Sequence, residues 1–196
     1  MFFIKVFVIL TVTVLHGNVI ANDTDSDTDT ISDTEDGLAN GTDLKNDFNA
    51  TLLDLASASG NGLFRFGDSY YDFHTDPELW DDARKICDAE GGYLAILNSE
   101  LEASILAAVF NTHPSSSLAG YILDKDVAFV GFTDYYKVSE YVTIHGQNIE
   151  KVGYNKWRQG EPDGPGVQRC GVVDRNGFIC NAYCTYPLAF ICEIPV

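Results

Sequence analysis

The chain has 196 residues and carries 29 Asp and Glu residues against 12 Lys and Arg residues, which gives a formal net charge of −17 at pH 7. This length is typical of one domain with an appended segment. Nucleic-acid binding depends on clustered Lys and Arg side chains that neutralise phosphates, so the acidic excess excludes nucleic acid as a partner.

Residues 1–21 have the pattern of a secretory signal peptide. A lysine near the start precedes an apolar run over residues 6–15, and Val19 and Ala21 occupy the −3 and −1 positions of a small-residue cleavage site. A transmembrane helix needs about 20 apolar residues, and this run is shorter, so no membrane span is expected. The sequence therefore predicts a secreted, extracellular protein.

Residues 22–62 form an acidic segment, and over residues 22–47 Asp alternates with Thr and Ser and no apolar period is present. Such a composition cannot bury enough apolar surface to offset chain entropy, so a disordered tether is expected here. The segment contains three N-glycosylation sequons, at Asn22, Asn40 and Asn49. These sequons indicate a glycoprotein.

The folded domain is expected to span residues 63–196. Aromatic residues alternate in part over 63–73, which predicts a strand. A helix is expected next, from an N-cap at Thr75, with a glutamate three residues later, to Gly91. A second helix is expected to follow Ser99, because apolar residues recur after it at helical spacing.

The second half of the domain is expected to consist of strands and loops. Short β-type runs occur at 128–132, 141–144 and 188–194, and a stretch expected to be mostly loop covers residues 153–177. Two helices in the first half and strands in the second describe an α+β domain.

The motifs from residue 63 onward together resemble the C-type lectin-like domain family. The resemblance rests on the segment from Trp80 to Cys87, the stretch "GGYLAIL", the strand "FVGF", Trp157 followed by Gly-Glu-Pro, and "CGVVDRNGFICNAYC" with "FICE" after it. It implies a C-type lectin-like fold in which two helices pack on small antiparallel sheets, with a long loop region and disulfide staples.

The chain has five cysteines, and disulfide bonds are expected because the secretory route is oxidising. The resemblance implies two bridges, Cys87–Cys192 and Cys170–Cys184, and leaves Cys180 unpaired. A Cys170–Cys180 bridge is the alternative. The odd thiol of Cys180 is either buried and inert or links two copies of the chain as a disulfide-bonded homodimer.

Glu161, Pro162 and Asp163 match a motif that, in sugar-binding members of this family, supplies oxygen ligands to one Ca²⁺ ion and to sugar hydroxyls. The resemblance therefore implies Ca²⁺ as a cofactor at Glu161, Asp163 and Asn181. It also implies that these residues and Gln168 bind the ligand. Calcium prefers about six to eight hard oxygen ligands, which carboxylates and amides provide.

The chain departs from that motif at two other positions. Gln168 occupies the place of a glutamate, and an Ile-Cys-Asn triplet ending at Asn181 occupies the place of Trp-Asn-Asp. A soft sulfur thus replaces an amide oxygen, and one carboxylate is lost. Any Ca²⁺ affinity is expected to be weak, with a Kd of about 10⁻³ M or poorer. The alternative for Glu161 and Asp163 is a solvated acidic turn.

The leading functional hypothesis is a secreted, non-catalytic carbohydrate-binding protein. It would recognise glycans or glycoproteins on cell or microbial surfaces, as in innate immunity, with weak dependence on calcium. The alternative is a calcium-independent protein-interaction module that kept the fold and lost the sugar site. An enzyme is not expected, because His74, His113 and His145 lie near no recognisable nucleophile motif.

Overall fold

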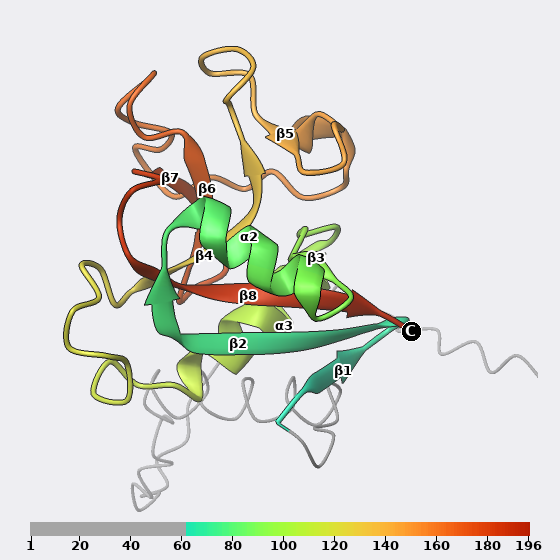
Figure 1. The fold of residues 1–196 in the computed structure, drawn as a ribbon. Helices are drawn as coiled ribbons and strands as arrows, with labels where there is room; N and C mark the ends of the chain where they lie inside the picture. The colour runs from blue at the N-terminus through green and yellow to red at the C-terminus, as the bar shows by residue number, and fades with distance from the viewer. Residues whose placement is uncertain (1–61) are drawn as a thin grey trace, which may run out of the picture. The chain divides into compact units, whose positions relative to one another are not determined.

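The computed structural model describes residues 62–196 of the chain, where two α-helices and one β-sheet form the α+β domain that the sequence predicts (Figure 1). Other predictions about chain organisation concern residues outside this range. They are the signal peptide at 1–21, the tether, of which residue 62 alone is described, and the sequons at Asn22, Asn40 and Asn49. Among residues 62–196, no helix is both long and apolar enough to cross a bilayer.

The strands of residues 62–196 join into one eight-stranded sheet in the order β1-β2-β8-β4-β6-β7, with β3 paired to β8 and β5 paired to β4. They are β1 (Phe64–Phe66), β2 (Ser69–Glu78), β3 (Tyr93–Leu94), β4 (Val127–Thr133), β5 (Val142–Thr143), β6 (Cys170–Asp174), β7 (Ile179–Ala182) and β8 (Leu188–Pro195). All neighbours are antiparallel except β4 and β8, which run parallel. This pair makes the sheet mixed, where the resemblance implies small antiparallel sheets.

Helix α2 (Trp80–Ala89) begins later than the sequence predicts. The expected cap at Thr75 is wrong, because Thr75 lies inside β2, which follows β8 as far as Glu78. The actual N-cap is Leu79, whose side chain makes no capping hydrogen bond. The helix start is fixed instead by the buried indole of Trp80, whose N–H donates to a backbone carbonyl of β4 at 3.0 Å.

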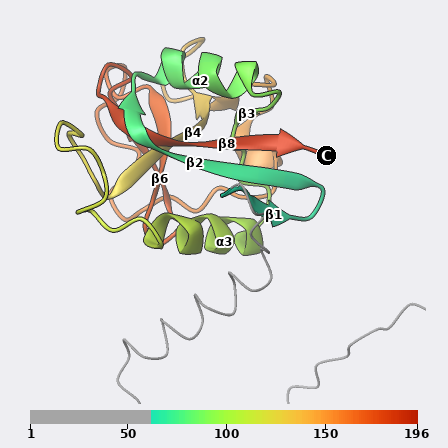
Figure 2. The same ribbon diagram turned by 60° about the horizontal axis from the view of Figure 1, so that its bottom comes forward.

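Helix α3 (Glu100–Asn111) begins where the sequence predicts. The hydroxyl oxygen of Ser99 accepts a hydrogen bond of 3.1 Å from the backbone N–H of Glu102, which satisfies one of the free donors of the first turn. Figure 2 shows α2 and α3 on opposite sides of the layer formed by β2 and β8. Each helix therefore buries its apolar side against a different face of the sheet.

Both disulfide bridges have the predicted pairing. Cys87–Cys192 joins α2 to β8, and Cys170–Cys184 joins β6 to the turn after β7, so the alternative Cys170–Cys180 bridge is wrong. Cys180 is buried and unpaired. The bridges have sequence separations of 105 and 14 residues. In the chain-entropy account, such loops restrain the unfolded chain by about 4–5 and about 3 kcal/mol.

The stretch 153–177, predicted to be mostly loop, contains the whole of β6. This strand pairs with β4 on one side and β7 on the other. All of its residues are buried, so it lacks the alternation of polar and apolar residues that marks a half-exposed strand. The loop that precedes β6 is thereby held beside β7, the last strand in the order, where the candidate site is formed.

Candidate functional site

The predicted ligand-binding residues meet in one pocket of about 190 Å³. Glu161 and Asp163 come from the loop before β6, on either side of Pro162, and the Glu161–Pro162 peptide bond is cis. Gln168 lies later in the same loop, and Asn181 lies on β7. Figure 1 shows the chain between β5 and β6, in orange, forming loops at one end of the sheet. The structure thus brings all four residues together from two separate elements.

Asn181 holds this loop in place from the neighbouring strand. Its side chain is buried, and its Nδ2 donates to the backbone carbonyl oxygens of Asp163 and Gln168 and, at 2.9 Å, to the hydroxyl of Tyr141. Its Oδ1 accepts a hydrogen bond of 3.1 Å from the backbone N–H of Asp163. Two carbonyl oxygens require a donor opposite them, so the orientation of the Asn181 amide is fixed by its surroundings.

Arg158 neutralises Glu161 within the site. A guanidinium nitrogen of Arg158 donates to Oε1 of Glu161 at 3.0 Å, and Oε2 accepts from the backbone N–H of Asp163 at 3.2 Å. The Glu161 side chain is 8% exposed, whereas that of Arg158 is 43% exposed. Both carboxylate oxygens of Glu161 are therefore engaged inside the protein, and the Arg158 guanidinium faces the solvent side of the pair.

Asp163 and Gln168 form the exposed part of the site. The side-chain amide nitrogen of Gln168 donates to Oδ1 of Asp163. Gly164 permits this contact: a Cβ at this position would lie 2.7 Å from Nε2 of Gln168, and its φ of +59° belongs to the left-handed region. Any side chain at Gly164 would displace the Gln168 amide from Asp163.

The donor set does not fit Ca²⁺ in this arrangement. Calcium needs about six to eight oxygen ligands that can turn toward the ion. Here both oxygens of Glu161, Oδ1 of Asp163 and Oδ1 of Asn181 accept hydrogen bonds from other groups of the chain. Cys180 also lines the pocket, and burial raises the pKa of its thiol to about 12, so it offers no thiolate. The Arg158 guanidinium supplies positive charge that an ion would otherwise bring.

Two tyrosines give the pocket an aromatic side. Tyr183 and Tyr186 follow β7, stack with their ring centroids 4.7 Å apart, and are each 37% exposed. Both line the pocket together with the carboxylate of Asp124. The pocket thus combines aromatic faces with carboxylate, amide and guanidinium groups. Such a lining can cover the apolar face of a polar ligand while hydrogen bonding its hydroxyls.

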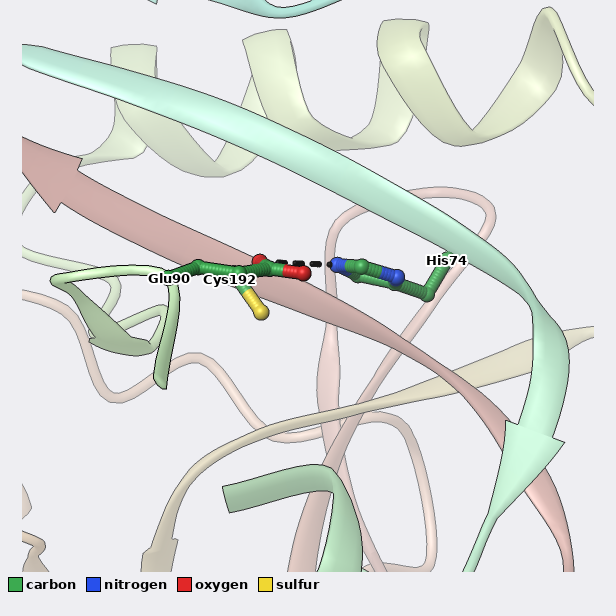
Figure 3. A group of neighbouring side chains, drawn as sticks. All are labelled: His74, Glu90 and Cys192. Atoms are coloured by element: carbon green, nitrogen blue, oxygen red, sulfur yellow. Dashed lines mark hydrogen bonds and ion pairs between the residues drawn. The ribbon is translucent and has the colours of Figure 1, made fainter. Parts of the chain in front are cut away.

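A separate group of ligand-type side chains lies between β2 and the end of α2. Among residues 62–196, His74, Glu90 and Cys192 are the one set of three His, Cys, Asp or Glu side chains whose donor atoms lie within 4.8 Å of one another. Figure 3 shows Nε2 of His74 facing Glu90, at 3.2 Å, with the Cys192 sulfur off the line of that contact. Because this sulfur is bonded to Cys87, it provides no thiolate for a metal. The group serves to join β2 to α2.

All three histidines predicted to lack a catalytic role have packing partners. His74 stacks on Phe190 with ring centroids 4.2 Å apart. His113 stacks on Phe73 at 4.5 Å, and His145 packs edge-on against Tyr93 at 4.6 Å. Each imidazole thus packs against an aromatic ring of the domain.

The sequence prediction of the site omitted several residues that the structure places there. Arg158 stands three residues before Glu161, so an i, i+3 ion pair was visible in the sequence. Tyr141 contacts Asn181 across 40 residues, and no local pattern indicates that contact. Tyr183 and Tyr186 gave a weak sign, because two tyrosines flank Cys184, one of the expected bridge cysteines.

Known proteins match more than half of the chain. The model of the family described as "Lectin C-type domain" matches residues 76–194. The hemolymph lipopolysaccharide-binding protein of Periplaneta americana is 35% identical over 127 residues, which cover 64% of this chain and 48% of that protein. The chain thus spans about half the length of this curated relative.

Solved structures show the same fold. The carbohydrate-recognition domain of the mouse scavenger receptor C-type lectin matches with a TM-score of 0.55 and 24% identity, covering 71% of this chain and 98% of that chain. The type II antifreeze protein of herring matches with a TM-score of 0.57 and 18% identity, covering 70% of this chain and 99% of that chain. At these identities the likeness is one of fold. The expected C-type lectin-like fold is confirmed, and the chain belongs to the C-type lectin domain family.

Proposed function

We propose that the domain binds carbohydrate, without catalysis and without a resident Ca²⁺ ion, in the pocket formed by Glu161, Asp163, Gln168 and Asn181. One observation supports this most directly: the four residues line a single pocket together with Arg158, a cation of the chain itself that pairs with Glu161. Asp163, Gln168 and Arg158 are polar residues of this pocket that are at least partly exposed. They are suited to hydrogen bonding with sugar hydroxyls.

Similar proteins favour a glycan as the ligand. The Periplaneta americana relative is named for lipopolysaccharide binding, and the mouse structure is named as a carbohydrate-recognition domain. These names support glycans or glycoproteins on cell or microbial surfaces as ligands of this chain, in a role such as innate immunity. The two disulfide bridges support the predicted secretion into an oxidising, extracellular environment.

We expect a single sugar unit to bind weakly, with a Kd of about 10⁻³ M, or about −4 kcal/mol. Arg158 and Glu161 already pair with each other, so neither charge is free to bind a ligand. Few strong contacts therefore remain for one monosaccharide. Useful affinity would then come from several binding units on one surface. A disulfide dimer through Cys180 is a poor source of such valency, because this side chain is buried.

A glycan array probed with the secreted protein, first in Ca²⁺ and then in EGTA, tests this function. We expect the same glycans to be bound under both conditions. Gln168→Ala and Tyr186→Ala should each weaken binding, whereas Tyr70→Ala should not, because Tyr70 lies on β2 and not in this pocket. Absence of glycan binding in both buffers would refute carbohydrate recognition, and binding abolished by EGTA would refute the calcium-free site.

A calcium-independent protein-interaction module is the second candidate. It is favoured by exposed apolar side chains in the loops beside the site, where Tyr136, Val138 and Val167 are 89%, 50% and 56% exposed. Under this function, replacing these three residues with Ser would abolish partner binding on cell surfaces. Enzymatic removal of surface glycans would leave that binding intact, which separates the two candidates.

A further inference from the structure

A second pocket lies next to the proposed sugar site and shares a wall with it. It measures about 400 Å³ and is lined by Tyr141, Trp157 and Pro162 together with residues of the loop that begins after β4. Glu161 and Asp163 line the first pocket, and Pro162, between them in the chain, lines the second. A volume of this size falls in the range of about 300–1,000 Å³ that is typical of small-molecule sites. We call it the Pro162 pocket.

The lining of the Pro162 pocket combines aromatic and polar groups. The ring centroids of Tyr141 and Trp157 are 5.0 Å apart. Both rings also pack edge-on against the core residue Phe132, each with its centroid 5.8 Å from that of Phe132, which fixes their positions. The pocket is also lined by the apolar residues Val138 and Ile149 and by the polar side chains of Ser139, Asn148, Glu140, Glu150 and Lys137. An aromatic surface bordered by hydroxyl, amide and carboxylate groups is suited to a hydroxylated ring compound.

Ser139 stands in a backbone conformation that requires support. Its φ is +63°, in the left-handed region that residues other than glycine rarely adopt. The backbone N–H of Ser139 donates to Oδ2 of Asp134 at 2.8 Å, and Asp134 is buried and paired with Arg169 at 2.9 Å. A buried carboxylate, paired with a partly exposed arginine, thus fixes the position of an exposed serine at the pocket. Backbone outliers held in this way are concentrated at ligand sites.

The two pockets are connected by one hydrogen bond. Tyr141 lines the Pro162 pocket, and its hydroxyl accepts from Nδ2 of Asn181, which lines the first pocket and positions Asp163. The hydrogen bond between Tyr141 and Asn181 therefore stabilises both pockets. A ligand that crosses Pro162 would contact residues whose positions are already fixed.

Charge restricts the ligand class. In the Pro162 pocket, Lys137 pairs with Glu140 at 2.7 Å, which leaves Glu150 as the excess charge. In the first pocket, Arg158 pairs with Glu161, which leaves the carboxylates of Asp124 and Asp163. Both pockets are thus negative in sum, and neither offers an unpaired cation among the residues that line it. Anionic groups such as phosphate, sulfate or sialic acid are therefore disfavoured.

From these observations we infer that the ligand is a neutral oligosaccharide of at least two sugar units that spans Pro162 and occupies both pockets. This inference rests on the proposed carbohydrate binding and adds a second subsite and a charge class to it. One unit is bound at Asp163 and Gln168, and a neighbouring unit packs on Trp157 and hydrogen bonds to Ser139.

Calorimetric titration of the secreted protein tests the second subsite. The probes are glucose, mannose, galactose and N-acetylglucosamine, and neutral oligosaccharides of two to five units built from each. We expect at least one series to gain about tenfold or more in affinity from one unit to the longer chains. The double variant Ser139→Gly and Glu150→Ala should lose this gain and keep the affinity for the single sugar. Glycine accepts the positive φ at 139, and both residues are exposed, so the domain should still fold.

The matched control is Ser116→Gly with Glu100→Ala, which changes the same residue types at exposed positions that line neither pocket. The control should retain the gain. Equal affinities for single sugars and oligosaccharides, or a gain that survives in the double variant, would overturn the second subsite while leaving sugar binding intact. Tighter binding of phosphorylated, sulfated or sialylated oligosaccharides would overturn the neutral class. Failure of every sugar to bind would instead refute the proposed function itself.

Discussion

The guanidinium of Arg158 donates to Oε1 of Glu161 at 3.0 Å, so the chain supplies its own cation beside the carboxylate that resembles a calcium ligand. The second oxygen of Glu161 accepts from the backbone of Asp163, which keeps the carboxylate turned inward. The chain therefore has the Glu-Pro-Asp motif of the family, but the glutamate of that motif is engaged by an arginine and a backbone N–H. A sequence can retain Glu-Pro-Asp and still form a site in which an arginine side chain pairs with the glutamate.

Replacing Arg158 should therefore strengthen calcium binding at this site. Arg158→Ala frees Oε1 of Glu161 and removes a positive charge from the pocket, and Ca²⁺ affinity depends on the number of charged ligands. We expect calorimetric titration to show no saturable binding for the parent protein up to about 10⁻³ M Ca²⁺, and at least about tenfold tighter binding for the variant.

Lys156→Ala is the control for this experiment, since it removes the same charge from a nearby exposed side chain that pairs with Glu100 at 2.8 Å. It should leave Ca²⁺ binding unchanged. Submillimolar binding of Ca²⁺ to the parent protein would contradict our description of the site.

Asn181→Asp should destabilise the domain, although an aspartate at this position is what the resemblance implies for a sugar-binding member of the family. The change would place a carboxylate oxygen opposite the carbonyl oxygens of Asp163 and Gln168. Loss of a buried donor costs about 1–3 kcal/mol. Urea unfolding at pH 7 measures this cost, and Asn155→Asp, at an exposed position, should change stability little. Equal stability of Asn181→Asp and the parent would rule out the hydrogen bonds described for this amide.

Cys180 should be chemically inert in the folded protein. Burial raises the pKa of its thiol to about 12, and its side chain has no exposed surface, so a thiolate is neither formed nor reachable near pH 8. We expect a colorimetric disulfide reagent to detect one thiol per chain in strong denaturant and no thiol in the folded protein. Cys180→Ala should give none in either condition. A dimer on non-reducing gels that disappears in Cys180→Ala would show that the thiol is accessible after all.

Stability should decrease as the pH rises through the titration of Glu102. Burial raises the pKa of Glu102 above its usual value of 4.5, and the nearby carboxylate of Glu193 adds to the rise, whereas hydrogen bonds from Tyr71 and Asn98 oppose it. The folded state therefore holds this proton more tightly than the unfolded state. Its contribution to the free energy of unfolding is full below about pH 4.5 and is lost as the pH passes the raised value.

Glu102→Gln removes this titration and keeps an oxygen that can accept from the backbone N–H of Asn98. Urea unfolding between pH 4 and pH 8 should show a smaller decline for this variant than for the parent protein. Glu150→Gln, at an exposed position, should keep the parent decline. Identical pH profiles for Glu102→Gln and the parent would refute the assignment.

The parts of the fold that depend on local pattern could be predicted from the sequence. The cap of α3 at Ser99 follows from a serine before an apolar period of helical spacing, and the bridges follow from the cysteine spacing of the family. The start of α2 could not be predicted from Thr75, because the pairing of β2 with β8 joins residues far apart in the chain. The helix-cap signal at Thr75 is local, and the pairing of β2 with β8 was the stronger influence on the backbone there.

The candidate site divides in the same way. Motif position placed Glu161, Asp163, Gln168 and Asn181 in one pocket, but it did not indicate how their hydrogen bonds are used. The contact between Asn181 and Tyr141 depends on two strands and a loop meeting in the folded domain. Residue identity at a motif position therefore predicted which groups meet, whereas their availability to a ligand depended on partners elsewhere in the chain.

The backbone N–H of Val196 donates to the carbonyl oxygen of Asp68 at 2.9 Å, so the last residue lies at the turn between β1 and β2, near the edge of the sheet formed by β1. Asn181 lies on β7, at the other edge of the strand order. An additional module fused after Val196 would thus be attached near the β1 edge of the sheet, away from the pocket. This placement makes the domain well suited to transplantation between polypeptides of different lengths without obstruction of its recognition loops.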